Sequence, residues 1–200
     1  MRPGHPHQIT YRPLSRDNWD DLVSLFDGHG NPGYCWCTFW RLSSTQYRQC
    51  SSGERRQALN ALVCEDIPTG ILGYRDGEVI GWCSIAPRET YERLNRSRTI
   101  PRIDDRATWS LACFYIRKDE QGKGLSLEFV RAAVDLAASH HAEVVEAYPV
   151  EPEIDADGQW HPAKSYSFMG YRSTFERAGF QEVTPGGAKR IIMRLEINGR

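Results

Sequence analysis

Two glycines separated by one residue, Gly122 and Gly124, follow an apolar run and immediately precede an amphipathic segment. Glycine lets the backbone approach a ligand closely. The first turn of a helix also offers unpaired N–H groups at the positive end of its dipole. If a strand ends and a helix begins here, residues 121–126 form a site for a phosphate or pyrophosphate. A plain glycine turn ahead of a core helix is the alternative interpretation.

Two well-known phosphate-binding loops do not fit this segment. A P-loop has its lysine followed by serine or threonine, whereas Lys123 is followed by Gly124. A dinucleotide-binding fingerprint has a third glycine at the position of Leu127. The loop must therefore be judged by its flanking elements, which are predicted to be a strand over residues 109–116 and a helix over residues 125–140.

The rest of the chain alternates between predicted strands and helices, without an internal repeat. We predict strands at residues 9–14, 69–74, 79–86, 144–150 and 190–197, and helices at 16–26, 53–64 and 166–178. The pair Asp76-Gly77 predicts a hairpin between two of these strands, and residues 88–106 are expected to begin as a short helix and end as a loop. This order favours a mixed α/β (or α+β) domain.

Composition and charge restrict the class of protein. The 200 residues fit one domain over 1–200, with a short flexible tail at about 1–8, and the net charge of −1 provides no global attraction to nucleic acid or anionic lipid. No apolar run approaches the roughly 20 residues that span a bilayer. The six cysteines are expected to be reduced thiols in a cytoplasmic protein. Cys64, Cys83 and Cys113 lie in apolar runs and are expected to pack as small hydrophobic residues.

The glycine loop and its surroundings resemble the GNAT superfamily of acyl-coenzyme A-dependent acyltransferases. Residues Gln121 to Ser126 look like the family's pyrophosphate motif, with Ser126 where the family usually has glycine or alanine. The first strand and helix, the hairpin at Asp76-Gly77 followed by Gly81, and the segment Phe175 to Phe180 resemble family elements in the same order. The resemblance covers about residues 9–197. It implies a central, mostly antiparallel sheet of six to seven strands flanked by helices.

The resemblance also implies a co-substrate and a reaction. Acetyl-CoA, or another acyl-CoA, would donate its acyl group to the amine of a small molecule by direct attack, and no metal is expected. Backbone amides of one bent strand would bind the pantetheine arm, and the glycine loop would bind the pyrophosphate. The residues implied in cofactor binding are Phe114, Tyr115, Ile116, Gln121, Gly122, Lys123, Gly124, Leu125, Ser126 and Phe175.

The family's usual proton donor is missing from its expected position. Members often carry a tyrosine five residues before the phenylalanine of the Gly-Phe pair, and here that residue is Phe175. Tyr171, one helical turn earlier, is the candidate acid, with Ser173 and Tyr166 nearby, and Glu146 is the candidate base. The alternatives are that Tyr171 is a packed amphipathic side chain and that Glu146 is a strand-end charge.

The segment from Tyr34 to Arg41 is rich in aromatic residues and is the candidate acceptor site. Its arginine, Arg41, is placed to meet a carboxylate or phosphate, unless these residues belong to the core beneath a loop. The candidate substrate-binding residues are Tyr34, Trp36, Phe39, Trp40 and Arg41.

The same segment contains Cys35 and Cys37, which we expect on one side of a short strand. A metal site that adds Cys50 or His29 is the alternative, although no second pair with zinc-ligand spacing occurs.

Three further alternatives remain open at the level of sequence. The donor is an aminoacyl-tRNA in some GNAT-like enzymes, and the arginines within residues 88–106 would then contact RNA. Those arginines otherwise meet an acidic acceptor or the coenzyme A 3′-phosphate, or form a solvated face. With Phe175 in the tyrosine position, a catalytically weak coenzyme A-binding regulatory module is the other alternative. A homodimer is compatible with the family, but no interface is indicated.

Overall fold

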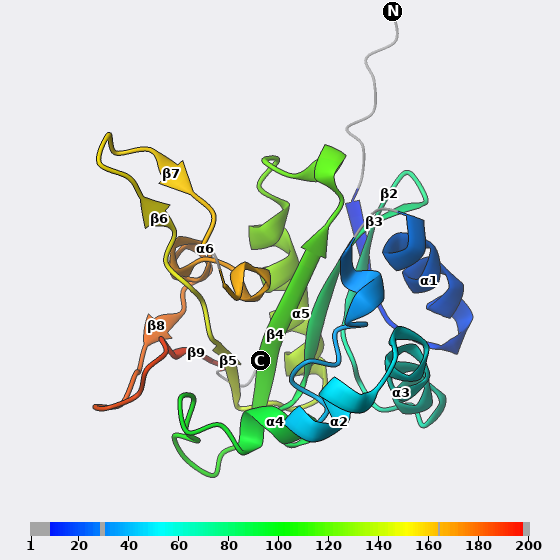
Figure 1. The fold of residues 1–200 in the computed structure, drawn as a ribbon, viewed down its shortest axis with the longest axis horizontal. Helices are drawn as coiled ribbons and strands as arrows, with labels where there is room; N and C mark the ends of the chain where they lie inside the picture. The colour runs from blue at the N-terminus through cyan, green and yellow to red at the C-terminus, as the bar shows by residue number, and fades with distance from the viewer. Residues whose placement is uncertain (1–8, 29–30, 164, 198–200) are drawn as a thin grey trace, which may run out of the picture.

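The computed structural model describes residues 9–28, 31–163 and 165–197 and is built around one twisted sheet (Figure 1). The seven strands run in the order β1-β2-β3-β4-β5-β9-β8, and all neighbouring pairs are antiparallel except β4–β5. The mostly antiparallel sheet expected from the sequence is therefore confirmed. Its strands are β1 (Ile9–Pro13), β2 (Ile71–Arg75), β3 (Glu78–Pro87), β4 (Thr108–Ile116), β5 (Val144–Ala147), β8 (Gln181–Glu182) and β9 (Met193–Glu196).

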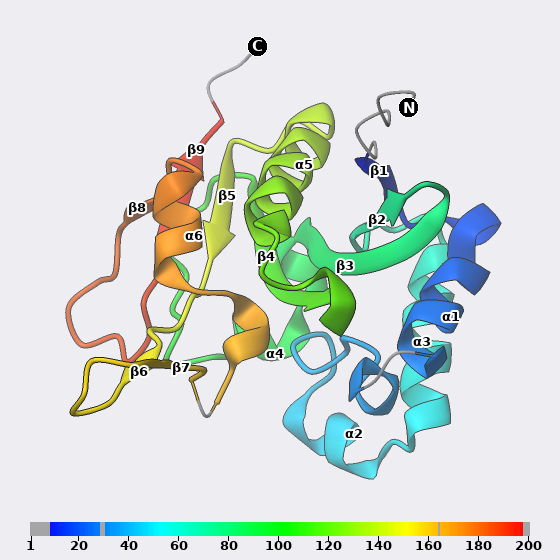
Figure 2. The same ribbon diagram turned by 90° about the horizontal axis from the view of Figure 1, so that it is seen from above.

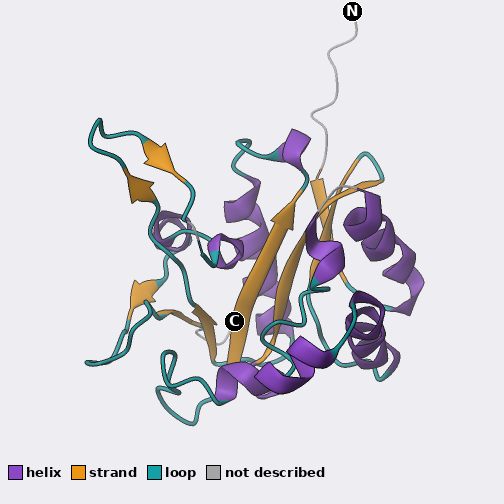
Figure 3. Cartoon of the chain, viewed as in Figure 1, coloured by secondary structure: helices purple, strands orange, loops and turns teal. Residues whose placement is uncertain are grey.

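Helices cover both faces of the sheet (Figure 2). α1 (Trp19–Gly28) and α3 (Ser52–Cys64) pack on one face, and α5 (Leu125–Ser139) and α6 (Arg172–Arg177) pack on the other. Shorter elements fill the connections (Figure 3). They are η1 (Arg16–Asn18), η2 (Asn31–Tyr34), α2 (Ser44–Gln49), η3 (Arg88–Thr90), α4 (Glu92–Asn95), η4 (Lys118–Glu120), β6 (Glu153–Ile154), β7 (Trp160–His161) and η5 (Ser167–Met169).

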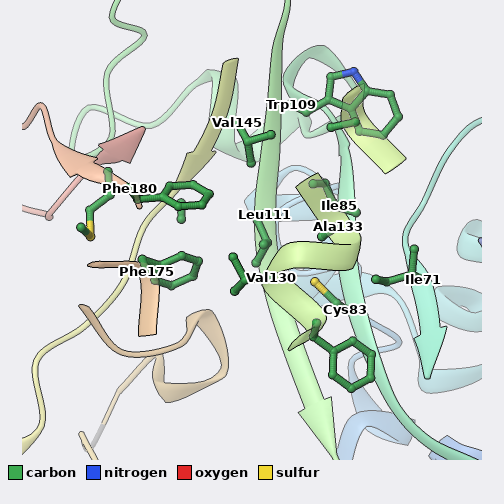
Figure 4. Packing of buried hydrophobic residues seen from close by; sticks show 14 of the residues in the cluster. Ile71, Cys83, Ile85, Trp109, Leu111, Val130, Ala133, Val145, Phe175 and Phe180 are labelled. Atoms are coloured by element: carbon green, nitrogen blue, oxygen red, sulfur yellow. The ribbon is translucent and has the colours of Figure 1, made fainter. Parts of the chain in front are cut away.

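The position of α5 is set by a pair of glycines on the sheet. Gly73 on β2 and Gly81 on β3 are paired in register, and a Cβ at either would meet the ring of Phe129 at 2.5 and 2.8 Å. Only glycines leave room for this ring, which anchors α5 close to the sheet. Further along α5, Val130 and Ala133 pack against the sheet residue Leu111 (Figure 4).

A β-bulge bends β4 where it leaves its neighbour β5. On β3, Ser84 pairs with Cys113 whereas the next residue, Ile85, pairs with Leu111, so Ala112 is the extra residue. The parallel pairing of β4 with β5 ends at Leu111. Within the described residues, the β4 edge over 112–116 therefore lies beyond the pairing with β5, and we call it the open edge of β4.

Several predicted elements are confirmed, some with shifted ends. The Asp76-Gly77 hairpin is present, with both residues at positive φ (52° and 86°), as a two-residue type I′ turn requires. The strands predicted at 144–150 and 190–197 are shorter in the structure, at Val144–Ala147 and Met193–Glu196. The tail predicted at about 1–8 lies outside the described residues. Among those that are described, no helix is long and apolar enough to cross a membrane.

Three other predictions are wrong. Residues 166–178 do not form one helix, because Gly170 (φ 83°) separates η5 from α6, and Tyr166 (φ 63°) adopts a left-handed conformation just before η5. Cys35 and Cys37 do not lie on a strand; they belong to a series of turns. Cys64, expected to pack as a small hydrophobic residue, ends α3 with its side chain exposed. Hydrophobicity alone does not reveal backbone turns of this kind.

Candidate active site

The glycine loop lies between η4 and the first turn of α5. Gly122 and Gly124 have φ of 77° and 78°, and Gly124 is the N-cap of the 15-residue helix α5. An added Cβ at either glycine would meet no atom within 4 Å. The glycines are therefore required for the left-handed backbone, and the space above them is open to a ligand. This arrangement suits an anion at the helix N-terminus.

Side chains around the loop hold its shape. The amide of Gln121 donates to the carbonyl of Ile116 at 2.9 Å, which ties the loop to the end of β4. Glu120 is almost fully buried and forms ion pairs with Arg75 (3.0 Å) and Lys123 (3.2 Å). The loop is thus fixed to both β2 and β4, although Lys123 itself is half exposed.

The open edge of β4 is supported from behind by an aromatic pair. Phe114 packs against Phe175 with ring centroids 6.1 Å apart. Phe175 is fully buried in the core and also contacts Phe180 (Figure 4). Phe175, predicted from the family to contact the cofactor, therefore lies behind Phe114 and fixes its position.

A cavity of about 520 Å³ lies on the open part of β4, which we name the aromatic cavity. The bent strand forms one wall, the loop after η2 forms the second, and the segment leading into η5 forms the third. In Figure 1, η2 and η5 lie on either side of β4. The lining residues are Pro32, Tyr34, Cys35, Cys37, Phe39, Trp40, Ala112, Cys113, Phe114, Tyr115, Ser165, Tyr166, Ser167 and Phe168.

The predicted acceptor residues divide into two groups. Tyr34 and Trp40 line the aromatic cavity, as does Phe39. Trp36 does not: it is buried, stacks on Trp19 at 6.1 Å and anchors the loop in the core. Arg41 is also buried away from the cavity lining, and its guanidinium donates to the Thr69 carbonyl at 3.0 Å.

Three cysteine thiols meet on the cavity wall. Cys37 lies with its Sγ 3.1 Å from Sγ of Cys113 on β4, and Cys35 adjoins them. The contact with Cys113 raises the pKa of Cys37, and hydrogen bonding to Cys37 together with burial raises that of Cys35. The thiols of Cys35 and Cys37 are therefore protonated and weakly nucleophilic at neutral pH. Within the described residues, no group of three or more His, Cys, Asp or Glu side chains is placed to hold a metal, and His29 lies outside them.

Glu146, the candidate base, is at the centre of a buried polar cluster. Its carboxylate is 0% exposed and pairs with Arg88 at 2.5 Å and Arg194 at 2.7 Å. The hydroxyl of Tyr148 donates to the same carboxylate at 2.7 Å, and Arg194 continues the network to Asp104. Burial and the Glu146 charge raise the pKa of Tyr148 well above its usual value. The carboxylate of Glu146 therefore faces these partners and is absent from the lining of the aromatic cavity.

Tyr171, the candidate acid, lies on the β5 side of the opening between β4 and β5. It is the half-buried N-cap of α6 and forms an isolated parallel bridge with Val150, just beyond β5. It is absent from the lining of the aromatic cavity, whereas Tyr166 is part of it. The structure thus places Tyr171 and Glu146 apart from the acceptor wall.

Several lining residues were not predicted. Cys113 was assigned only a packing role, and Ser165, Ser167 and Phe168 were expected in or before a continuous helix. The sequence gives little indication that these residues line the cavity, because their position depends on the break at Gly170 that turns this segment toward β4. A glycine between two short polar-aromatic runs was the feature that indicated such a turn.

Comparison with known proteins agrees with this geometry. A family model for the acetyltransferase (GNAT) family matches residues 36–158. The putative acetyltransferase yncA from Salmonella typhimurium, solved with acetyl-CoA, is 15% identical; the match covers 96% of this chain and 95% of that chain, with a TM-score of 0.53. No curated protein matches the sequence.

Two other solved structures are similar at the level of the fold. Aminoglycoside acetyltransferase AAC(6')-Ib, solved with ribostamycin and coenzyme A, is 15% identical over 94% of this chain and 93% of that chain, with a TM-score of 0.58. A ribosomal-protein-alanine N-acetyltransferase from Brucella melitensis is 14% identical over 94% and 99%, with a TM-score of 0.51.

These findings define the class of the protein. The overall fold of this chain is similar to that of structures solved with acetyl-CoA or coenzyme A. The family model spans more than half of the chain, so the chain belongs to the GNAT acetyltransferase family. The resemblance inferred from the sequence is confirmed.

Proposed function

We propose that the protein transfers an acetyl group from acetyl-CoA to the amine of a small molecule. The observation that carries this proposal is the continuity of two features on one strand. The glycine loop, suited to a pyrophosphate, follows β4 after the short helix η4, and the open edge of β4 forms a wall of the aromatic cavity. A donor bound along this edge would present its thioester to an acceptor in the cavity.

The thioester supplies an activated carbonyl, and the chain supplies the environment for attack. Peptide N–H groups on the open edge over 112–116 would bind the pantetheine arm and stabilise the negative charge that develops on the thioester oxygen. Tyr34, Phe39 and Trp40 would hold the acceptor against this edge. The amine nitrogen forms the new C–N bond, the C–S bond breaks, and coenzyme A leaves with the electron pair.

The two protons have different destinations in this proposal. The attacking amine must be neutral and loses a proton, which passes to water in this proposal, because no carboxylate or histidine of the described residues lines the aromatic cavity. Tyr171 would protonate the departing thiolate from the β5 side.

We expect Tyr171→Phe to lower kcat by at least about tenfold with KM unchanged, as loss of an acid group does. A steady-state assay of coenzyme A release measures this, and an unchanged kcat would remove Tyr171 from the mechanism.

The cofactor half of the proposal is tested by calorimetric titration with acetyl-CoA. We expect binding by the native chain and at least a tenfold weaker affinity for Gly124→Glu, because the new carboxylate would lie where the pyrophosphate approaches the N-terminus of α5. Gly124→Gln is the matched control, since it imposes the same strain at φ 78° without the charge. A smaller loss for Gln than for Glu assigns the effect to the anion.

Transfer itself is measured by mass spectrometry on a panel of amines. Formation of an amide together with free coenzyme A supports the enzyme. Binding without turnover on any amine would instead favour a regulatory coenzyme A-binding module. No binding of acetyl-CoA would overturn the proposal, and longer acyl-CoAs and aminoacyl-tRNA would then be the donors to test.

A further inference from the structure

A second cavity of about 500 Å³ adjoins the aromatic cavity, and we name it the arginine cavity. Trp40 and Tyr166 line both cavities, with their rings stacked at a centroid distance of 6.2 Å. Three arginines and several hydroxyl groups form the remaining wall, and none of the acidic residues that the structure describes contributes to it. The lining residues are Trp40, Ser43, Ser44, Thr45, Arg93, Arg96, Ser97, Thr99, Tyr166 and Arg190.

Two of these arginines are held in place by aromatic rings. The guanidinium of Arg190 lies 3.5 Å from the ring centroid of Tyr166. The guanidinium of Arg93 lies 4.0 Å from that of Phe39 and 6.0 Å from that of Trp40. Such stacking orients an arginine and leaves the edges of its planar fork to donate hydrogen bonds to an anion.

Neither of these guanidinium groups pairs with a carboxylate among the described residues. Arg93 and Arg190 are half-buried, and burial lowers the pKa of Arg190, although an arginine remains charged. The third arginine, Arg96, is exposed and pairs with Glu92 at 3.1 Å. A cavity wall with two partly desolvated cations and no counter-ion favours an anionic ligand.

One residue of the arginine cavity, Trp40, also has a hydrogen-bond donor without a partner among the described residues. The indole N–H of Trp40 is buried and has no hydrogen-bond partner in the described part of the chain. Burying such a group without a partner costs free energy unless a ligand or water satisfies it. A smaller cavity beside Arg190 adds Lys189 and also Glu151, whose carboxylate lies 3.6 Å from Arg172.

We propose that Arg93 and Arg190 form an anion-binding subsite for the acceptor, which is an amine that carries a carboxylate or phosphate group. The proposal rests on the acyl transfer proposed above. The amine lies against β4 in the aromatic cavity, and the anion lies beyond the Trp40–Tyr166 pair in the arginine cavity. Because two stacked rings stand between these positions, the amine and the anion are several bonds apart, and a flat apolar spacer fits the aromatic residues.

The test measures binding of matched probes to the protein saturated with coenzyme A. By calorimetry, 4-(aminomethyl)benzoate is compared with benzylamine, and O-phosphoethanolamine with ethanolamine. We expect each anionic probe to bind at least tenfold more tightly than its neutral partner, and the stronger pair to identify the anion. The same pairs in the acetyl-transfer assay should show the preference in KM.

Three variants assign the preference to the two arginines. Arg93→Gln and Arg190→Gln should each reduce the preference for the anionic probe by at least about fivefold, and the double variant should abolish it. Binding of benzylamine should stay unchanged, which shows that the variants are folded. The matched control is Arg98→Gln, an exposed arginine after α4 that lies outside the cavity lining; it should keep the full preference.

The outcomes separate this inference from the proposed function. Equal binding of charged and neutral probes, binding of none at millimolar concentration, or a preference that survives the double variant would overturn the subsite. Failure to bind acetyl-CoA would overturn the proposed function instead, and the preference, then measured on the protein alone, would still decide on the subsite.

Discussion

Two groups of arginines in this molecule have opposite surroundings. In the cluster around Glu146, Arg88 and Arg194 are almost fully buried and face two carboxylates, those of Glu146 and Asp104. In the arginine cavity, Arg93 and Arg190 are half-buried, stack on aromatic rings and face a wall to which the described part of the chain contributes no carboxylate. The charges of the first group are satisfied within the chain. The second group forms no ion pair with a carboxylate among the described residues.

The buried cluster around Glu146 connects β4 and β5 near the point where their pairing ends. Ser110 on β4 pairs with Glu146 on β5, one residue before the parallel pairing ends, and the Ser110 hydroxyl is 2.7 Å from that of Tyr148. The cluster therefore holds the two strands together at the base of their opening. We infer that Glu146 is a positioning residue, which acts on the site through the spacing of β4 and β5.

The largest expected effect comes from breaking the satisfied cluster. Glu146→Gln removes the charge that Arg88 and Arg194 share, and leaves two buried cations without their common partner. We expect a loss of about 3–5 kcal/mol in the free energy of unfolding. Urea denaturation measures it. A variant of native stability that has lost turnover would instead identify Glu146 as the base.

The sequence could predict the fold because its signals are local. The Asp76-Gly77 turn, the apolar run of β3 and the glycine at the start of α5 each depend on a few neighbouring residues, and each was located correctly. The glycine loop was found for the same reason. The pair Gly73 and Gly81 fits Phe129 only in three dimensions, so its role could not be predicted.

The acceptor site was predicted less completely, because it depends on backbone turns and on partners distant in the sequence. Trp36 and Trp40 belong to the same aromatic run, but left-handed conformations at Trp36 and Cys37 turn one into the core and leave the other at the cavity. Arg190 lies far along the chain from that run, and only Tyr166 connects the two.

An intermediate effect should come from Arg41, the arginine that the sequence suggested for an anion. Its two terminal nitrogens donate to neutral oxygens, those of Thr69, Thr90 and Tyr91, and the guanidinium stacks on the Tyr91 ring at 4.3 Å. We expect Arg41→Gln to lower the free energy of unfolding by about 1–3 kcal/mol, as loss of charged hydrogen bonds does. The preference for anionic probes should not change.

The control for this variant is Arg48→Gln, an exposed position on α2 with little expected effect on either measurement. If Arg41→Gln abolished the anion preference while leaving stability unchanged, the comparison between buried and cavity arginines would be wrong, and Arg41 would have the role first predicted from the sequence.

The smallest effect on stability is expected at Arg190, and this small effect is informative. Arg190→Met keeps apolar contact with the Tyr166 ring but removes a charge that has no carboxylate partner among the described residues. Because no ion pair is broken, the free energy of unfolding should change by less than about 0.5 kcal/mol. Urea denaturation without any ligand measures it.

A loss of 2 kcal/mol or more, roughly what a removed charged hydrogen bond costs, would mean that Arg190 supports the fold. A negligible change, beside the large loss for Glu146→Gln, would mean that the chain keeps a partly desolvated cation for a reason other than folding, and a charged ligand supplies that reason.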